Sequence, residues 1–338
     1  MTLAERIDLL AQLGNYLLSG DEYLNAVMQR TEYNNRWLTV ENCEKAAKAI
    51  GQHFLQKEGL VNWAASYGIA EKTTPKKVGL VMAGNIPLVG FHDVLAVFLS
   101  GHHAFVKLSE KDQYLLPQLI KKLGEWDERA KAYFSIVERL TGTEAVIATG
   151  SNNSARIFEK YFGKYPNIIR KNRNAIAVLD GTESMADLYA LGNDVFEYYG
   201  LGCRNVSKIY VPKTYEFEPL LEAMHEYKTI VLNTKYKNNF DYNYAMLLLN
   251  KVPFKANGCI ILTKNEAITS RIASLHYEYY DKADNLVVEI NRRKEEIQCV
   301  VTKMEIAGIK TIPFGKAQQP SLTDYADGVD TLDFLKSL

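Results

Sequence analysis

The chain has 338 residues, which allows one large domain or two domains of ordinary size. Its 40 Lys and Arg residues balance its 40 Asp and Glu residues, so the net charge gives no general attraction to nucleic acid or to an anionic membrane. Hydrophobic residues make up 47% of the chain, as expected for a soluble globular protein, and no apolar run reaches the roughly 20 residues of a membrane-spanning helix.

The N-terminal part of the chain carries helical patterns. Thr2 and Glu5 form a capping box, and the apolar residues that follow recur at helical spacing. A second helix is expected from about Thr39, with Cys43 on its buried face, and a short third helix runs through Trp63. These helices are expected to pack against the rest of the protein.

From residue 78 the pattern changes to short apolar strands that alternate with amphipathic helices. Strands are expected at residues 78–82, 104–108, 134–137, 145–148, 167–170 and 175–179. Helices are expected between them at residues 87–100, 114–126 and 153–162. This alternation predicts an α/β fold with a parallel sheet wound on both faces, which binds ligands outside the carboxyl ends of its strands.

The second half of the chain is less regular. Helices are expected at residues 183–199 and between Pro212 and His225. Strands are expected at residues 207–211, 229–232, 259–262 and 286–290, whereas residues 233–243 have the polar, aromatic-rich composition of a surface loop. A short helix is expected at the end of the tail, residues 321–338.

The spacing of the cysteines indicates the redox compartment of the protein and whether it has a metal site. Four cysteines lie far apart, at Cys43, Cys203, Cys259 and Cys299. None has the spacing of a zinc site, so no metal is expected, and sparse cysteine is typical of a reducing compartment. The N-terminus has no uninterrupted apolar core and does not read as a secretory signal. The expected location is therefore the cytoplasm.

Cys203 lies on the turn that organises our interpretation of the chain. A helix runs into this turn, Gly200 and Gly202 break it, and a strand follows at once. Glycines there permit unusual backbone dihedrals and let another molecule approach closely. A cysteine in such a turn can act as a nucleophile if its pKa is lowered. Local chemistry alone favours the alternative of a packed core thiol.

Asn85 lies between an expected strand and an expected helix. Its amide has the donor that an oxyanion requires, although local sequence favours a simpler role as the cap of the helix.

Two further strand ends carry candidate cofactor contacts. Lys107, Ser109 and Glu110 follow a buried strand, where they can bind ribose hydroxyls or phosphate, or can be solvated charges. The run Thr149–Ser151, which includes Gly150, forms a strand-to-helix turn where backbone N–H groups favour anions, or where Ser151 is an ordinary N-cap. The GxGxxG fingerprint is missing, which argues against the ordinary dinucleotide-binding turn.

The order of these segments resembles the aldehyde dehydrogenase superfamily. The matching segments are Gly84-Asn85-Ile-Pro87, Phe105-Val-Lys107-Leu-Ser109-Glu110, Ala148-Thr149-Gly150-Ser151 and Gly200-Leu-Gly202-Cys203. The superfamily carries an asparagine- and proline-containing turn, a lysine-ending strand, a Thr-Gly-Ser turn and a Gly-x-x-Cys loop in this order. More narrowly, the chain resembles the acyl-CoA reductases related to the fatty-acid reductase subunit of bacterial bioluminescence. The narrower match rests on four segments, which are Gly84–Pro87, Phe105–Ser109, residues 203–212 and residues 324–334.

The resemblance implies a fold and separate roles for its domains. It implies two doubly wound α/β domains with the active site in the cleft between them. Residues 1–182 would hold the N-terminal helices and the cofactor-binding domain, and residues 183–312 the catalytic domain. Residues 313–338 would form a tail that packs back on the cofactor domain or on a partner subunit. A homo-oligomer or an acyl-transferring partner is compatible with this expectation.

The resemblance also implies roles for the candidate residues. Cys203 would be the nucleophile and Asn85 an oxyanion donor. The cofactor contacts would be Lys107, Ser109, Glu110, Thr149, Gly150 and Ser151. The substrate would be an acyl-CoA or an acyl-protein thioester, reduced to the aldehyde. The resemblance favours NADPH, although Glu110 suits the ribose diol of NADH.

One departure from the superfamily indicates the direction of the reaction. Aldehyde-oxidising members carry a glutamate whose carboxylate activates the water that hydrolyses the acyl-enzyme, and Ile169 occupies that position here. Isoleucine cannot act as a general base, so reduction is expected. The alternatives are an acyl phosphate reductase, a cofactor-independent acyltransferase or thioesterase that uses Cys203, and a non-catalytic acyl-binding protein.

Overall fold

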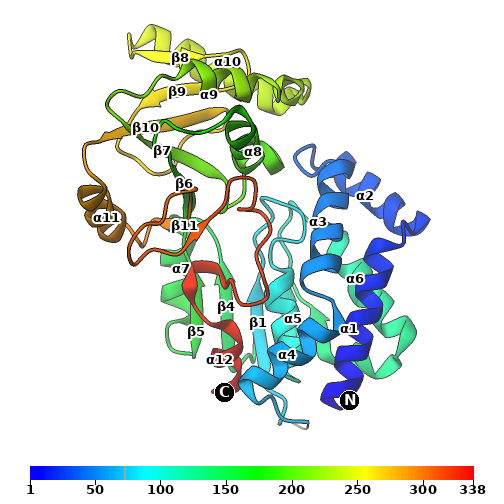
Figure 1. Cartoon of the computed structure of the whole chain (residues 1–338). Coiled ribbons are helices and arrows are strands. Elements are labelled where there is room, and N and C mark those ends of the chain that lie inside the picture. The colour runs from blue at the N-terminus through cyan, green and yellow to red at the C-terminus, as the bar shows by residue number, and fades with distance from the viewer. Residues whose placement is uncertain (72–73) are drawn as a thin grey trace. The chain divides into compact units, whose positions relative to one another are not determined.

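The computed structural model describes residues 1–71 and 74–338. These residues form two compact units, one of Met1–Asn172 with Pro320–Leu338 and one of Arg173–Gln319 (Figure 1). The units divide after residues 172 and 319, rather than after residues 182 and 312 as we expected from the sequence. In the described part of the chain, no helix has both the length and the apolar character needed to cross a membrane.

The first unit begins with four helices that pack together and cover α5 and α6 of the same unit. They are α1 (Leu3–Leu18), α2 (Glu22–Asn34), α3 (Val40–His53) and α4 (Lys57–Tyr67). The predicted capping box is confirmed, because Thr2 Oγ1 accepts from Glu5 N at 3.2 Å and Glu5 Oε2 accepts from Thr2 N at 2.7 Å. Helix α2 was not expected, because few of its side chains are apolar and buried.

The sheet of the first unit has five parallel strands in the order β3-β2-β1-β4-β5. The strands are β1 (Lys77–Val81), β2 (His103–Lys107), β3 (Phe134–Ile136), β4 (Ala145–Thr149) and β5 (Asn167–Arg170). The helices between them are α5 (Phe91–Leu99), α6 (Leu115–Trp126), a 3-10 helix η1 (Glu128–Tyr133) and α7 (Asn152–Phe162). The strand order runs outward from β1 in both directions, and since parallel crossovers are right-handed, α5 and α7 cover opposite faces.

The sheet of the second unit has seven strands in the order β12-β11-β6-β7-β10-β9-β8. The strands are β6 (Asn174–Val178), β7 (Val206–Pro212), β8 (Phe254–Ala256), β9 (Ile261–Lys264), β10 (Ser274–Tyr280), β11 (Ile297–Val301) and β12 (Thr311–Ile312). Among the described residues the pairing of β8 with β9 is antiparallel and the other pairings are parallel. The expected α/β class with largely parallel sheets is confirmed.

The helices of the second unit flank this sheet and include three segments that differ from the sequence-based prediction. The elements are α8 (Met185–Phe196), η2 (Glu197–Gly200), α9 (Glu218–His225), η3 (Lys228–Leu232), α10 (Thr234–Leu249) and α11 (Ala283–Arg292). The strand predicted at residues 229–232 was wrong, because η3 forms a 3-10 helix there. The strand predicted at residues 286–290 was wrong, because Leu286 and Ile290 are the buried face of a helix.

The loop predicted at residues 233–243 was also wrong. Asn233 starts helix α10, because its Oδ1 accepts from Lys235 N at 3.0 Å and from Tyr236 N at 3.2 Å. The buried side chains Tyr236, Phe240 and Asn243 then recur at helical spacing. The polar composition of these residues therefore led to the prediction of a loop, although they form a helix that buries one narrow face.

The C-terminal tail, which ends in η4 (Ala326–Gly328) and α12 (Thr331–Lys336), packs within the first unit. A buried ion pair anchors it, since Arg170 Nη1 lies 2.5 Å from Asp93 Oδ2 and Arg170 Nη2 donates to Thr331 Oγ1 at 2.8 Å. Asp93 belongs to α5 and Arg170 ends β5, so the tail is tied to both a helix and a strand of the five-stranded sheet.

Candidate active site

The turn that carries Cys203 lies in the second unit, between η2 and β7. Three consecutive residues that precede the cysteine have a positive φ, 51° at Tyr198, 59° at Tyr199 and 74° at Gly200. The left-handed region is unfavourable for a non-glycine residue and such residues gather at functional sites. The surrounding structure must therefore hold this turn in place.

Asn205 holds the turn. Its side chain is 1% exposed, and its Oδ1 accepts from Gly202 N at 2.7 Å. Its Nδ2 donates to Asp194 O at 3.0 Å and to Glu197 O at 2.9 Å, which are carbonyls at the end of α8 and the start of η2. One amide thus joins the helix end to the backbone beside Cys203 and satisfies carbonyls that the helix leaves unpaired.

Asp194 ties a second segment to the same helix end. The carboxylate is 1% exposed and accepts from Gly315 N at 2.6 Å and from Ala317 N at 2.9 Å. Burial raises the pKa of this carboxyl to about 6, against the opposing effect of the two N–H donors. Arg204, which follows Cys203, donates to Ala317 O at 3.4 Å. The segment around residue 315 is therefore fixed beside the Cys203 turn.

Cys203 differs from two of the other cysteines in its exposure. Cys43 and Cys259 are fully buried, and burial raises the pKa of both thiols, that of Cys259 to about 11. Cys203 is half-buried at a turn, and Cys299 is half-buried on strand β11. A nucleophilic thiol must be reachable and able to ionise, so Cys203 fits that role better than the two buried cysteines.

The two histidines in this unit that sequence reasoning weighed as bases are held by backbone carbonyls. The Nδ1 of His225 lies 2.9 Å from Asn257 O, and the Nδ1 of His276 lies 2.9 Å from Ala267 O. Each imidazole is thus bonded at Nδ1 to the backbone of its own surroundings.

The candidate cofactor residues lie in the first unit, at the carboxyl ends of β2 and β4, and Asn85 follows the end of β1. These three strands are direct neighbours in the order β2-β1-β4, so the residues that follow them share one edge of the sheet. The turns are closely packed, because a Cβ at Gly84 would lie 2.5 Å from Ser109 Oγ and a Cβ at Gly150 would lie 2.8 Å from Ser154 Cβ. The close approach of Gly84 brings the turn after β1 against the turn after β2.

Asn85 lies in the turn after β1 and is half-buried. Helix α5 begins at Phe91 with Gly90 as its N-cap, so the expectation that Asn85 caps this helix was wrong. The helix starts later than the sequence predicted because Leu88 has a φ of 55° and its N–H donates to Asp112 Oδ2 at 2.9 Å. The amide of Asn85 is therefore not used as a helix cap.

The turn after β2 presents charged side chains to solvent. Lys107 and Glu110 are exposed, and the Nζ of Lys107 donates to Glu138 O at 3.0 Å. Ser109 Oγ accepts from Lys111 N at 3.2 Å, which closes the turn. The exposed residues Lys107, Glu110 and Lys111 thus flank Ser109 in the sequence.

The turn after β4 begins helix α7. Ser151 is its N-cap, with Oγ 3.2 Å from Ser154 N, so the predicted capping role is confirmed. Capping leaves the remaining N–H groups of the first turn available to an anion. Thr149 and Gly150 are half-buried directly before the cap.

Ile169 lies on β5, next to β4, and pairs with Ala148. Its side chain is half-buried, and the next residue, Arg170, is the buried partner of Asp93. The position thus holds an apolar side chain at the strand end.

Sequence reasoning did not identify Asn205 and Asp194, although Asn205 lies two residues after Cys203. A signal for Asn205 exists, since an asparagine directly after a glycine turn often bonds to local backbone groups. Within residues 1–71 and 74–338, no group of three or more His, Cys, Asp and Glu side chains is arranged to hold a metal ion.

Comparisons with known proteins give relatives for the chain. The model of the acyl-CoA reductase (LuxC) family matches residues 5–239, which is more than half of the chain. A curated relative, long-chain acyl-protein thioester reductase 2 of Photobacterium leiognathi, is 21% identical over 252 residues, which cover 68% of this chain and 52% of the relative. The chain therefore spans about half the length of that relative.

Solved structures of aldehyde dehydrogenases share the fold. Aldehyde dehydrogenase 21 of Physcomitrella patens aligns with a TM-score of 0.68 at 13% identity, over 93% of this chain and 78% of its own. A mutant of aldehyde dehydrogenase C of Pseudomonas syringae, in complex with NAD+ and octanal, aligns with a TM-score of 0.64 at 11% identity, over 90% and 73% of the two chains. At these identities the likeness shows the fold alone.

Proposed function

We propose that this chain, which belongs to the acyl-CoA reductase (LuxC) family, reduces an acyl thioester to the aldehyde through an acyl group carried on Cys203. The observation that carries the proposal is the Cys203 turn. A half-buried thiol stands on a strained, glycine-containing turn that a buried asparagine locks to the preceding helix. Such a turn presents a nucleophile at a fixed position and leaves room for a substrate.

The first step transfers the acyl group to the protein. The Cys203 thiolate attacks the carbonyl carbon of the thioester, a new C–S bond forms, and the C–S bond to the leaving thiol breaks. The negative charge passes from the Cys203 thiolate to the leaving thiolate, which then takes up a proton to replace the one that the Cys203 thiol released. We propose that the Asn85 amide and the backbone N–H of Cys203 donate to the oxygen that becomes negative in this step.

The turns after β1, β2 and β4 fit a nicotinamide dinucleotide. Neighbouring atoms leave no space for a side chain at Gly84 or Gly150. The N-terminus of α7 offers backbone N–H groups to a phosphate. When bound, the reduced nicotinamide supplies the hydride that converts the acyl group to the aldehyde. Cys203 is released as a thiolate when its bond to the carbon breaks. We assign Lys107, Ser109, Glu110, Thr149, Gly150 and Ser151 to binding this cofactor.

The choice between NADPH and NADH depends on the turn after β2. A carboxylate such as Glu110 accepts from a ribose diol and repels a 2′-phosphate, whereas Lys107 and Lys111 attract the phosphate. All three side chains are exposed at one strand end. We propose NADPH as the preferred cofactor, with NADH as the alternative that the same assay measures.

The apolar side chain of Ile169 supports reduction over aldehyde oxidation. Hydrolysis of an acyl-cysteine needs a base beside the attacking water, and an isoleucine supplies none. The chain would therefore retain the acyl group until hydride arrives.

A substrate assay tests the proposal. Aldehyde formation is measured with acyl-CoAs of increasing chain length and with an acyl-protein thioester, each with NADPH and with NADH. Cys203→Ser should abolish aldehyde and labelling by radioactive acyl-CoA, whereas Cys299→Ser, at the other half-buried cysteine, should retain both. Activity with an acyl phosphate but no thioester supports the related acyl phosphate reductase. Release of free acid without any nicotinamide would indicate a thioesterase instead of a reductase. Acyl transfer without any nicotinamide would indicate an acyltransferase.

A further inference from the structure

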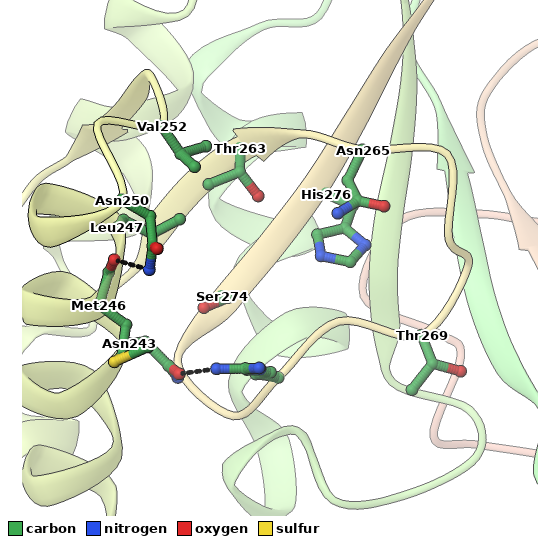
Figure 2. Close-up of a pocket in the computed structure, with 11 residues that line it drawn as sticks. Asn243, Met246, Leu247, Asn250, Val252, Thr263, Asn265, Thr269, Ser274 and His276 are labelled. Carbon is green, nitrogen blue, oxygen red and sulfur yellow. Dashed lines mark hydrogen bonds between the residues drawn. The ribbon is translucent and has the colours of Figure 1, made fainter.

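A pocket of about 350 Å³ lies in the second unit, between helix α10 and strands β9 and β10 (Figure 2). The loop that joins β9 to β10 forms its remaining wall. None of its lining residues belongs to the Cys203 turn. The volume lies in the range of pockets that bind small molecules.

His276 contributes a buried acceptor to the pocket. The residue is 9% exposed, and its Nδ1 lies 2.9 Å from Ala267 O. A carbonyl oxygen can only accept, so Nδ1 carries the hydrogen and Nε2 has a free lone pair. Burial, together with the nearby charge of Lys208, lowers the pKa of His276 and keeps the ring neutral. Among the described residues, Nε2 has no hydrogen-bond partner.

Thr263 adds a hydroxyl beside this acceptor. Thr263 and His276 are paired on neighbouring parallel strands, so their side chains share one face of the sheet. Thr263 is 6% exposed, and within the described part of the chain its hydroxyl makes no hydrogen bond. Both side chains point into the pocket in Figure 2. Within the described part of the chain neither the Thr263 hydroxyl nor His276 Nε2 is a fully buried unsatisfied group, so water or a ligand in the pocket can reach both.

The charge of the pocket comes from Arg271. Its Nη1 donates to Asn243 Oδ1 at 3.4 Å, and the Nδ2 of Asn243 donates to Ile272 O at 2.8 Å, which holds the asparagine in place. Arg271 is the lining cation, and no Asp or Glu is among the residues that line the pocket. Such a lining favours an oxyanion.

The opposite wall is apolar. Met246 and Leu247 of α10, with Val252 beyond its end, line this side. Met246 is a flexible side chain that adapts to varied ligands. The pocket therefore offers a cation, an apolar wall and a buried acceptor next to a hydroxyl.

We propose that this pocket binds a small organic oxyanion that has an apolar stem and a hydroxyl group at its other end. The anion pairs with Arg271, the stem lies against Met246 and Leu247, and the hydroxyl donates to His276 Nε2 beside Thr263. A carboxylate and a phosphate share the chemistry that Arg271 recognises. The proposal concerns a site apart from Cys203 and does not depend on the proposed function.

Calorimetric titration of the full chain tests this site. The probes are ω-hydroxybutanoate, ω-hydroxyhexanoate and ω-hydroxyoctanoate, with the ω-hydroxyalkyl phosphates of the same lengths. Hexanoate lacks the hydroxyl and the matching diol lacks the anion. We expect one hydroxylated oxyanion to bind with a Kd of about 1 mM or tighter and at least about tenfold better than either truncated probe. The two anionic series decide between carboxylate and phosphate.

Three variants assign the binding to this pocket. Arg271→Gln should weaken binding of the best probe at least about tenfold, and Thr263→Val should weaken the hydroxylated probe while leaving hexanoate unchanged. Lys264→Gln removes an exposed cation from the residue next to Thr263 and should leave binding unchanged. Absence of binding by every probe, equal binding of the truncated probes, or equal binding by Arg271→Gln would overturn the proposal.

Discussion

Asn205 Oδ1 accepts a hydrogen bond from Gly202 N at 2.7 Å and thereby fixes the backbone next to the cysteine that we propose as the nucleophile. The same amide donates to two carbonyls of the preceding helix end. Removing the amide therefore frees a turn that contains two left-handed tyrosines. Asn205 acts on Cys203 through the backbone and is a positioning residue.

Asn205→Asp is the sharpest test of this role. Aspartate keeps the acceptor for Gly202 but turns the donor into an oxygen that faces the carbonyls of Asp194 and Glu197. Each lost hydrogen bond costs about 1 kcal/mol, and an unsatisfied buried group costs more. We expect the rate of Cys203 acylation and of its alkylation by iodoacetamide to change at least about tenfold, with a lower Tm. Asn34→Asp, at an exposed asparagine that also donates to a carbonyl, should change neither rate. Normal acylation in Asn205→Asp would contradict the positioning role.

The lysine at the end of β2 is expected to bind the cofactor and to have no part in acylation. Lys107→Ala should weaken cofactor binding by about tenfold, as expected for one lost charge-assisted hydrogen bond. Glu110→Gln should raise the preference for NADPH over NADH, because it removes a negative charge near the 2′-phosphate. Titration of protein fluorescence with both nucleotides measures these changes, and the CoA burst measures acylation. Lys121→Ala, on the exposed face of α6, serves as the control. Unchanged cofactor affinity in Lys107→Ala would reject the contact.

The buried pair of Arg170 and Asp93 should control the stability of the first unit. Arg170→Met leaves the Asp93 carboxylate buried without its partner, which costs about 3–5 kcal/mol, whereas Thr331→Val removes one hydrogen bond and costs about 1–2 kcal/mol. Urea denaturation measures both effects, and limited proteolysis reports release of the tail. Lys171→Met, which breaks an exposed ion pair with Glu159, should cost less than about 1 kcal/mol. Equal losses for Arg170→Met and Lys171→Met would show that burial of the pair contributes nothing.

His102 should make stability of the first unit sensitive to acid. It is 2% exposed, its Nδ1 accepts from Lys76 N at 3.1 Å, and its Nε2 donates to Leu335 O at 3.0 Å. Burial lowers its pKa below 6.5, and the neighbouring Lys76, His103 and Arg6 act in the same direction. The unfolded chain therefore binds more protons as the pH falls below about 6.5, so this contribution is complete above that pH and declines below it.

The difference in unfolding free energy between wild type and His102→Asn isolates this effect. Asp112 and Asp194 have pKa values raised to about 6 by burial, so their contribution changes in the opposite direction, and it cancels in the difference. We expect the difference to shrink between pH 7.5 and pH 5.5. A difference that stays constant across this range would show that folding does not change the pKa of His102.

The sequence predicted the first unit better than the second for a physical reason. Strands β1 and β4 are short apolar runs buried on both faces, which leaves few alternatives. In α11 the β-branched run around Val287 favoured a strand, whereas tertiary packing buries only Leu286 and Ile290. The Cys203 turn was visible because glycines and a cysteine are local signals. The role of Asp194 could not be predicted from the sequence, because its hydrogen-bond partners Gly315 and Ala317 lie far along the chain.

The fate of an acyl group on Cys203 separates reduction from hydrolysis, and Ile169 is the residue concerned. We expect a burst of CoA close to one equivalent per active site when acyl-CoA is supplied without reduced cofactor, followed by slow release of free acid. Hydrolysis needs a base beside the attacking water, and the half-buried isoleucine offers none. Reduced cofactor should then discharge the label as aldehyde. Stopped-flow detection of free thiol measures the burst, and Cys203→Ser should show none.

Ile169→Glu extends this test, because it introduces a carboxylate at the position of the isoleucine. Faster release of free acid from the acyl-enzyme is expected if the variant folds, and a thermal melt establishes folding independently, since burying a carboxylate is costly. The wild-type burst is the cleaner measurement because it requires no substitution. Rapid, steady hydrolysis by wild type without cofactor would mean that another side chain supplies the base, and a thioesterase would then account for the reactive Cys203 better than a reductase.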